Sequence, residues 1–370
     1  MRRTVLGALH EARGAHWMVR QDWEIPGWFA GVEQEYDALQ EGAGLVDLSH
    51  RTRLRITGRD RRSWFHGQCS QDIAGLPDGR GAYATIMDVR GRLICDLRVY
   101  ALCDSLLVDV PAGTEPPIAQ YLDHYLVMER CEVEDITEAW AQLAVQGPHS
   151  CYVLGALLGA DICAMEPWEI REFAFADAPI HVARVFHCGE DGFDLFVPAG
   201  HAAALWAGLC QPRVEFSVHS VGWEALNVRR VEAGIPWWGF ELSPAIVPLE
   251  ARLDHGVCRT KGCYVGQEII ARIDARGHVN NLLGGFHIAG SALPASGAEI
   301  RHAGKKVGLV SSAVESLSLK RPVGMGFFRR ELHTPGQILE AAGADGPIAL
   351  EVTPLPFVPH DAPERKPGQG

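Results

Sequence analysis

Two segments of the chain alternate apolar and polar residues at period two, and the clearer one covers residues 83–100. Such alternation predicts β-strands, because successive side chains of a strand point to opposite faces. Residues 88–91, with Asp first and Gly fourth, have the pattern of a type I turn, which makes the segment a predicted hairpin. Its second strand carries Leu93, Cys95, Leu97 and Val99 on one face and Ile94, Asp96, Arg98 and Tyr100 on the other. The implied register places Tyr83 opposite Asp96, away from the main apolar face.

Residues 181–197 repeat this pattern around a turn at residues 189–192. The register of this second predicted hairpin places His187 opposite Asp194. Such a pair would let the carboxylate orient the imidazole and raise its pKa. The alternative is a surface ion pair, which contributes little to stability.

Residues 261–268 form a loop of polar groups between glycines. Gly262 and Gly266 permit a positive φ or close backbone approach, and three isoleucines soon after Gln267 predict a short helix that begins there. The unbonded N–H groups at such a helix start favour an anion or an acceptor. Lys261 lies two residues from Cys263 and would lower the pKa of a nearby thiol. The alternative for Cys263 is a small buried apolar residue.

Residues 223–234 are predicted to be helical, with Leu226 and Arg230 one turn apart and a stop at residues 234–236. An arginine in the last turn of a helix is favourable beside the helix dipole. Trp237 and Trp238 follow the stop and are expected to fill the core.

Three arginines, Arg51, Arg53 and Arg55, alternate with Thr52, Leu54 and Ile56. As a strand they line one face, which is either a solvated surface or an electropositive rim for a partner. From residue 282 the chain changes to short alternating strands separated by Gly, Pro and Ser, which predicts a small β-barrel or meander. Residues 357–370 are rich in Pro and Gly and are predicted to be a flexible tail.

Composition narrows the classes of function. With 370 residues, 47% of them hydrophobic, the chain can bury a large core in two or three domains. Its formal charge of -12 argues against broad nucleic-acid binding, because a polyanion is repelled before contact.

The ten cysteines include no CxxC pair, so neither a zinc site nor a disulfide framework is expected, and a reducing cytoplasm is favoured. Charged residues interrupt the first 19 positions, which argues against a signal peptide. The longest uncharged apolar segment, near residues 152–160, is too short to cross a bilayer, so no membrane role is indicated.

The loop at 261–268 also carries a family resemblance, which three further segments extend over most of the chain. The matching runs are Lys261-Gly262-Cys263-Tyr264-Val265-Gly266-Gln267-Glu268, then residues 230–236 with 248–250, residues 306–312 and residues 322–326. Together they resemble the YgfZ-type folate-binding proteins, relatives of the glycine-cleavage T-protein, an aminomethyltransferase. T-proteins usually have an aspartate where this chain has Cys263 and a basic residue where it has Gln267. These two differences favour the YgfZ-type branch.

The resemblance implies an α+β fold with three lobes around a central cleft. The expected domains are a folate-binding core over residues 1–282, made of two interleaved subdomains, a β-barrel over residues 283–356, and the tail. Composition and periodicity agree with this architecture.

The resemblance also implies a site for tetrahydrofolate. By analogy Tyr83 packs beside the folate, Asp96 lies near the nitrogens that carry the one-carbon unit, and Asp194 grips the pterin. The expected site residues are Tyr83, Asp96, His187, Asp194 and Arg230 at the folate, a functional Cys263, and the signature loop Lys261, Gly262, Cys263, Tyr264, Gly266, Gln267 and Glu268. T-proteins commonly have a tyrosine where this chain has His187. If the arginine-bearing strand is a rim rather than a solvated face, its ligand would be a polyglutamate tail or another partner.

The leading function implied by the resemblance is tetrahydrofolate binding in support of iron–sulfur protein assembly or repair, with tRNA modification affected indirectly. The alternative is a folate-dependent aminomethyltransferase or demethylase that uses Asp96 as its catalytic carboxylate. A scaffold that has lost its ligand is a third possibility. The expected partners are folate and iron–sulfur client proteins in the cytoplasm, with no metal site, no membrane and no direct nucleic-acid contact.

Overall fold

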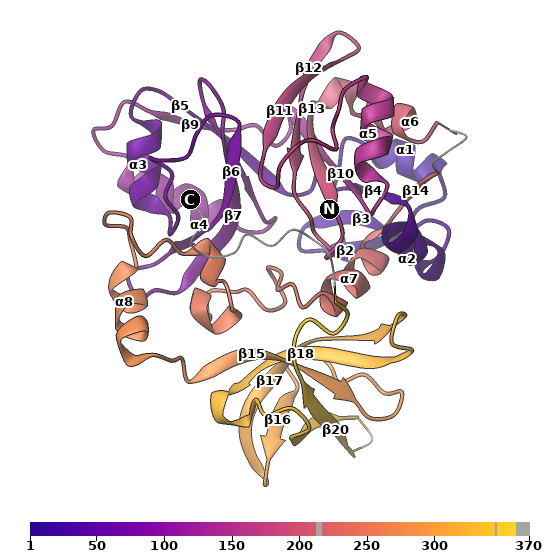
Figure 1. Ribbon diagram of the computed structural model, residues 1–370, viewed down its shortest axis with the longest axis vertical. Helices are drawn as coiled ribbons and strands as arrows, with labels where there is room; N and C mark the ends of the chain where they lie inside the picture. The colour runs from indigo at the N-terminus through magenta and orange to yellow at the C-terminus, as the bar shows by residue number, and fades with distance from the viewer. Residues whose placement is uncertain (212–216, 345, 360–370) are drawn as a thin grey trace.

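The computed structural model describes residues 1–211, 217–344 and 346–359. Three lobes surround a common centre: a five-stranded sheet with its helices, a six-stranded sheet with its helices, and a C-terminal barrel (Figure 1). The predicted α+β class is confirmed. The predicted division at residues 282 and 356 stays a prediction, and residues 360–370 of the predicted tail lie outside the described residues.

The six-stranded sheet forms the first lobe, and helices cover both of its faces. In spatial order it contains β11 (Ile170–Phe175), β12 (Ala178–Arg184), β13 (Gly192–Pro198), β10 (Trp140–Gln146), β4 (Ala43–Asp47) and β14 (Val218–Ser220). One face packs on α1 (Gly7–Ala12), α5 (Ser150–Leu158) and α6 (Ala202–Leu209), and the other on α2 (Val32–Glu41) and α7 (Trp223–Glu232). Neighbouring residues of β4 point to opposite faces of the sheet. Leu45 packs on the face covered by α1, α5 and α6, and Val46 packs on the face covered by α2 and α7.

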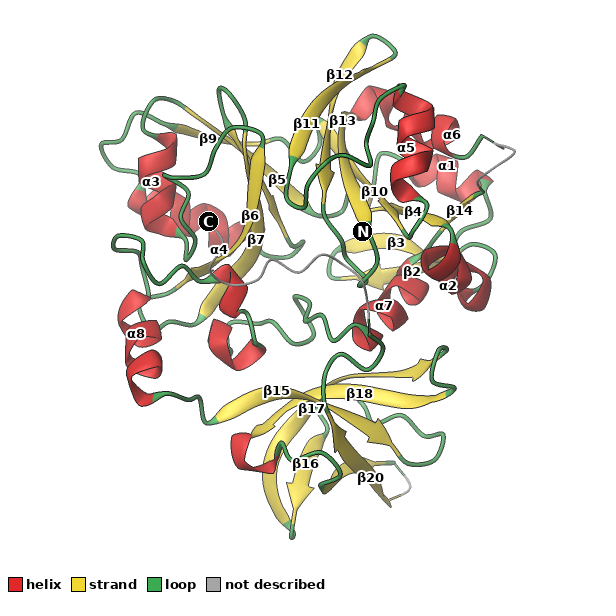
Figure 2. Ribbon diagram, in the orientation of Figure 1, coloured by secondary structure: helices red, strands yellow, loops and turns green. Residues whose placement is uncertain are grey.

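The five-stranded sheet forms the second lobe. Its spatial order is β6 (Arg80–Met87), β7 (Leu93–Ala101), β8 (Leu106–Val110), β5 (Thr52–Thr57) and β9 (Glu132–Asp135). Cys95, Leu97 and Val99 of β7 pack against α3 (Arg61–Gln68) and α4 (Glu115–Tyr125), which Figure 2 shows on one side of the sheet. The opposite face turns toward the six-stranded sheet, with Tyr100 and Phe196 in contact at 5.8 Å between ring centroids. The polar face predicted for β7 therefore faces the centre of the molecule.

A closed barrel forms the third lobe, as predicted. Its strands, in order around the barrel, are β15 (Asn281–Ile288), β18 (Arg321–Arg329), β17 (Lys305–Ser316), β16 (Glu299–His302), β19 (Ile338–Gly343) and β20 (Gly346–Thr353). The helix α8 (Gln267–Arg276) leads into it and begins at the predicted residue. A three-stranded sheet of β1 (Arg2–Arg3), β3 (Trp23–Trp28) and β2 (His16–Arg20) lies at the N-terminus.

Both predicted hairpins form, but their predicted registers are wrong. Tyr83 pairs with Arg98 rather than with Asp96. The turn closes with a bond from Asp88 to Arg92, and a bulge lies between Ile86 and Met87, so each of the two shifts the ladder by one residue. In the second hairpin Asp194 pairs with Ala183, because β12 ends at Arg184, and His187 lies beyond the strand. Both side-chain contacts nevertheless form, since the hydroxyl of Tyr83 bonds to Asp96 and the ring of His187 bonds to Asp194.

The three arginines at 51–55, predicted to line one face that is either solvated or a rim for a partner, differ in their burial. Arg53 is completely buried, and its guanidinium donates to the backbone carbonyls of Arg51, Ser49 and Thr137. Only Arg55 of the three is exposed. A guanidinium with five donors is stable inside the protein when carbonyls take up those donors.

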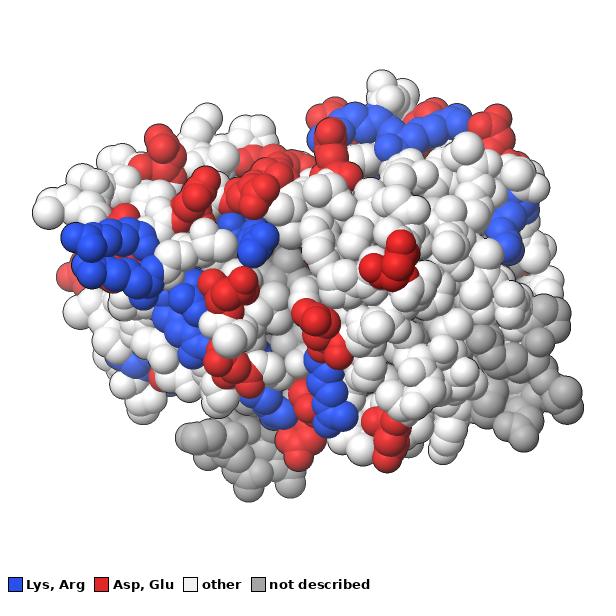
Figure 3. All heavy atoms as spheres, turned by 90° about the horizontal axis from the view of Figure 1, so that it is seen from above, with Lys and Arg blue, Asp and Glu red and all other residues white. Residues whose placement is uncertain are grey.

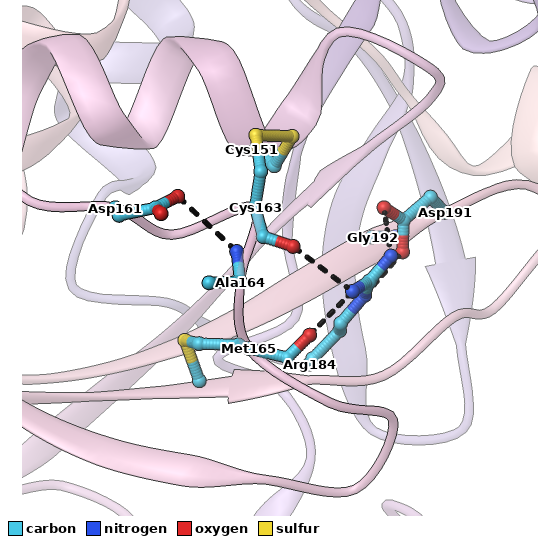
Figure 4. The surroundings of a disulfide bond; sticks show 8 residues. All are labelled: Cys151, Asp161, Cys163, Ala164, Met165, Arg184, Asp191 and Gly192. Carbon is cyan, nitrogen blue, oxygen red and sulfur yellow. Dashed lines mark hydrogen bonds and ion pairs between the residues drawn. A yellow bond between two sulfur atoms is a disulfide. The ribbon is translucent and has the colours of Figure 1, made fainter.

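One disulfide bond is present, although the cysteine pattern predicted none. Cys151 of α5 is bonded to Cys163 in the following loop, where the two Cα atoms lie 5.0 Å apart. Figure 4 shows Arg184 beside this bond, donating to the carbonyls of Cys163 and Met165 and to the carboxylate of Asp191. A separation of 12 residues is not diagnostic of a disulfide, so the pairing depends on how α5 packs.

No helix in the described part of the chain is long and apolar enough to span a membrane. On the face drawn in Figure 3, acidic and basic side chains are interspersed, and no broad basic area is visible.

Candidate functional site

A cavity of about 440 Å³ lies where the lobes meet. Side chains of β6 and β7 line it, together with residues that follow β4 and β12 of the six-stranded sheet and the segments 233–238 and 251–255 that follow α7. Much of its wall is aromatic, because Trp168, Trp223, Trp237 and Trp238 all contribute. Binding sites for small molecules are typically concave, mostly apolar and equipped with a few polar groups, which describes this cavity.

Asp96 and Tyr83 are the first polar pair on this wall. The Tyr83 hydroxyl donates to Oδ2 of Asp96 at 3.1 Å. Oδ1 of Asp96 has no hydrogen-bond partner among the described residues, although the side chain is only 8% exposed. Burial raises the pKa of Asp96, and the positive charges of Arg51 and Arg98 oppose that rise.

A chain of alternating charges runs behind this pair. Arg51 Nε donates to Asp109 at 2.6 Å, and Arg98 Nη1 donates to the other oxygen of Asp109 at 3.2 Å. Arg98 Nη2 lies 3.1 Å from Nδ1 of His187, and Nε2 of His187 lies 2.7 Å from Asp194. These groups connect the five-stranded sheet to the six-stranded sheet.

The contacts of His187 define its protonation. Arginine has no acceptor, so Nδ1 of His187 must accept from Arg98, and the proton must sit on Nε2, where it is donated to Asp194. Burial lowers the pKa of His187, with the charge of Arg98 adding to the effect and Asp194 opposing it. The predicted rise of this pKa is therefore wrong, because burial outweighs the carboxylate.

The remaining predicted folate residues lie behind the wall. Asp194 is fully buried, accepts also from Gln142 Nε2 at 3.0 Å, and supports His187 rather than lining the cavity. Arg230 is fully buried too, and donates to Glu241 at 2.5 Å, to Ser312 at 2.7 Å and to Asn227 at 2.9 Å. Because Ser312 belongs to β17, Arg230 joins α7 to the barrel.

The signature loop packs against α3 instead of facing the cavity. The Lys261 ammonium donates to the backbone carbonyls of His66, Cys69 and Gln71, at the end of α3, where carbonyls lack helical partners. Gly266 has φ 85°, and a Cβ there would lie 2.9 Å from the carbonyl oxygen of Asp88, so this position requires glycine.

The other side chains of this loop differ in exposure. Tyr264 is buried, Gln267 is half-buried, and Gly262, Cys263 and Glu268 are exposed. None of the seven predicted loop residues is part of the cavity lining. The Lys261 ammonium, predicted to lower the pKa of the Cys263 thiol, instead donates its hydrogen bonds to backbone carbonyls.

Comparison with known families agrees with this architecture. A model of the GCVT N-terminal domain matches residues 6–261, and one of the glycine cleavage T-protein C-terminal barrel domain matches residues 282–359. The chain belongs to the glycine cleavage T-protein family.

Similar members of the T-protein family are named aminomethyltransferase. The protein from Geobacillus kaustophilus is 31% identical over 366 residues, which cover 96% of this chain and 98% of that protein. The protein from Streptomyces coelicolor is 31% identical over 364 residues, with 96% and 97% covered. The crystal structure of aminomethyltransferase T from Bartonella henselae has a TM-score of 0.89 at 25% identity, with 97% and 98% covered. The predicted superfamily is confirmed, and the narrower YgfZ-type branch stays a prediction.

Sequence reasoning missed several groups at this T-protein cavity. Arg51 and Arg98 were noted as strand residues but not as cavity residues, and Arg20 and Trp168 were not noted at all. Trp168 has φ 64°, which is rare for a large side chain and cannot be inferred from its neighbours in sequence. The alternation along β7 did indicate Arg98, since it shares a face with Asp96.

Proposed function

We propose that this protein is a folate-dependent one-carbon transferase in which Asp96 is the catalytic carboxylate. The observation that carries the proposal is Asp96 on the wall of the aromatic cavity, a buried carboxylate whose Oδ1 has no hydrogen-bond partner among the described residues. The names of the similar proteins support this function better than folate binding alone. Buried polar atoms usually have partners, so an unpartnered one on a cavity wall indicates a place for a ligand.

The cavity fits a reduced folate in size and in character. Its volume falls within the range of about 300–1,000 Å³ that small-molecule sites occupy, and four tryptophans supply flat apolar surface for the ligand's rings. Tetrahydrofolate, when bound, supplies ring nitrogens that accept or release a one-carbon unit. Tyr83 holds one oxygen of Asp96, which leaves the other free to orient an amine and to accept its proton.

Binding of tetrahydrofolate is the first test. It should quench the tryptophan fluorescence of the cavity and, at about 100 times its Kd, stabilise the fold by about 2.7 kcal/mol. p-Aminobenzoylglutamate, which lacks the pterin, is the control and should have a much smaller effect. Absence of both quenching and thermal stabilisation with tetrahydrofolate would exclude the folate assignment.

One structural observation supports a second function, which is the assembly or repair of iron–sulfur proteins in the cytoplasm. Cys263 is a free thiol at the surface, in the loop that distinguishes the YgfZ-type branch. An exposed thiol is available to a client protein. This function predicts that Cys263 acts outside the folate cavity and independently of Asp96.

Alkylation tests the accessibility of Cys263. A thiol reagent at near-neutral pH should label Cys263 and the other exposed cysteine, Cys103, well before Cys69, Cys95 and Cys188, whose burial raises the pKa of each thiol. Tetrahydrofolate should not slow the labelling of Cys263, because this residue lies outside the cavity lining.

Cys263→Ser then separates the two functions, with Cys103→Ser as the matched control. The iron–sulfur function requires that only Cys263→Ser reduces the activity of iron–sulfur enzymes in cells. Equal behaviour of the two variants would reject that function, while transfer activity in vitro should survive both changes.

A further inference from the structure

The disulfide between Cys151 and Cys163 lies outside the cavity but holds a segment that reaches it. This segment, residues 159–169, connects α5 to β11, and Trp168 near its end lines the cavity. No residue from 159 to 168 belongs to a helix or a strand. The position of the segment therefore depends on the disulfide, on packed side chains and on separate hydrogen bonds.

Arg184 of β12 also holds this segment. Its guanidinium donates to the backbone carbonyls of Cys163 and Met165 and makes two bonds to the carboxylate of Asp191, at 2.9 and 2.8 Å (Figure 4). Asp191 lies in the hairpin turn that follows His187, another residue of the cavity lining. Arg184 therefore joins the segment 159–169 to a second part of the cavity wall.

The conformation of Trp168 depends on its surroundings. Its φ is 64°, in the left-handed region that a large side chain rarely adopts. Its N–H donates to the backbone carbonyl of Arg184 at 2.9 Å, and its own carbonyl accepts from the N–H of Gly81 at 2.6 Å. Such a conformation persists only where neighbouring contacts maintain it. Loosening the segment should therefore displace Trp168 before it disturbs the paired strands.

The disulfide can be reduced from one side. Cys163 is an exposed residue, whereas Cys151 is only 7% exposed. A thiolate attacks one sulfur of a disulfide and forms a mixed disulfide, so access to one of the two cysteines is enough. A dithiol completes the exchange, because it gives up two electrons and two protons, closes into its own disulfide and leaves two cysteine thiols. The contacts of Arg184 and the buried side chains of Ile162 and Met165 then hold the segment without the cross-link.

We propose that the Cys151–Cys163 disulfide is a redox switch for the cavity, which binds its ligand more tightly when the disulfide is formed than when a dithiol has reduced it. Without the cross-link, a smaller fraction of the molecules holds Trp168 in its place on the wall. The apparent Kd rises in proportion as the binding-competent fraction falls. The inference rests on the proposed function for the identity of the ligand, tetrahydrofolate, but not for the motion of the segment.

Thermodynamic linkage distinguishes a switch from a disulfide that only stabilises the fold. If reduction lowers the affinity for tetrahydrofolate by some factor, tetrahydrofolate must favour the disulfide over the two thiols by the same factor. A disulfide that only stabilises the fold as a whole changes the melting temperature but neither of these quantities. The two measurements are independent, so each checks the other.

The test compares the oxidised and the reduced wild-type protein in oxygen-free buffer, because tetrahydrofolate is sensitive to oxygen. Alkylation after denaturation should count eight thiols in the oxidised protein and ten after treatment with dithiothreitol. Reduction should raise the Kd for tetrahydrofolate by at least about 5-fold, the lower end of a typical coupling between two sites. Tetrahydrofolate should shift the equilibrium with dithiothreitol toward the disulfide by the same factor. Amide hydrogen exchange should become faster in residues 159–169 on reduction and stay unchanged in residues 83–100 of the other sheet.

Cys163→Ser should show the affinity of the reduced protein and no response to dithiothreitol. Cys103→Ser is the matched control, because it removes an exposed cysteine outside the disulfide and should respond as the wild type does.

The proposal is overturned by ten free thiols in protein equilibrated with oxidised dithiothreitol, by equal affinity of the two redox states for tetrahydrofolate, or by a Cys163→Ser variant that still responds to dithiothreitol. If the oxidised wild type does not bind tetrahydrofolate, the transferase function fails, and hydrogen exchange still decides the switch. Unchanged exchange in residues 159–169 on reduction would then reject it, so the two failures are distinguishable.

Discussion

Replacing Asp96 by Asn is expected to lower the rate of one-carbon transfer by about 10²- to 10⁴-fold, the usual contribution of a positioned acid or base. Affinity for tetrahydrofolate should change little, because an amide keeps the shape of the side chain and its contact with Tyr83. The measurement is product formation from tetrahydrofolate with candidate aminomethyl and methyl donors, together with a separate binding titration. A variant with wild-type kcat would remove Asp96 from the mechanism.

The pH dependence gives a second measure of Asp96. Transfer requires the ionised carboxylate, so activity should fall as pH falls through its pKa, which burial places above that of an ordinary aspartate. Asp96→Asn should abolish that acidic limb. Asp254→Asn is the control, since Asp254 also lines the cavity but is exposed and paired with Arg259 at 3.0 Å.

The effect of Asp96→Asn on the free energy of unfolding shows whether a loss of activity comes from lost catalysis or from a less stable fold. An acid whose pKa is higher in the folded state than in the unfolded state destabilises the fold as pH rises through those values. Asp96 therefore opposes folding at neutral pH, and Asp96→Asn should not lower the free energy of unfolding. Loss of activity without loss of stability is the expected combination.

Replacing Arg230 by Met is expected to have the largest effect on stability. It would leave Glu241 without its cation in a fully buried site, with hydrogen bonds only from Ser312 and the Trp237 amide, and breaking a buried ion pair in this way typically costs about 3–5 kcal/mol. Arg230→Met combined with Glu241→Gln should recover much of that loss, because no uncompensated charge remains. Denaturant unfolding measures both variants.

A surface pair supplies the comparison for Arg230. Arg301 and Glu299 lie 2.8 Å apart but are largely exposed, so Arg301→Met should change stability by no more than about 1 kcal/mol. A direct folate role for Arg230 predicts a different result, in which Arg230→Met loses ligand affinity and keeps its stability. That outcome would contradict the structural assignment of Arg230.

The amino-acid sequence predicted the faces of the strands better than their registers. Alternation along residues 93–100 was enough to place Asp96 and Arg98 away from the apolar core, because side-chain direction repeats with every second residue. The wider turn and the bulge between Ile86 and Met87 have no such signal, so the predicted partner of Tyr83 was two residues from the observed one. Its contact with Asp96 survives because a tyrosine is long enough to reach a diagonal neighbour.

The charged residues were harder to place. The donors of Arg53 and Arg230 are satisfied in part by Thr137 and Ser312, which lie 84 and 82 residues away, and no local pattern contains those partners. The same holds for Arg20, whose site consists of Trp223 and Phe240, about 200 residues further along the chain. The family resemblance located the cavity, and only the three-dimensional packing identified which arginines face it.

The strand order also has a consequence for the order of events during synthesis. All strands of the five-stranded sheet lie within residues 52–135, so this lobe can close early. The six-stranded sheet pairs β4, at residues 43–47, with β14, at residues 218–220, and must wait for the later strand. At about 5–20 residues per second the ribosome needs roughly 10–35 seconds to cover that interval. The apolar strand β4 has neither of its two neighbours until β10, at residues 140–146, is made, and its second edge then stays open until β14 follows.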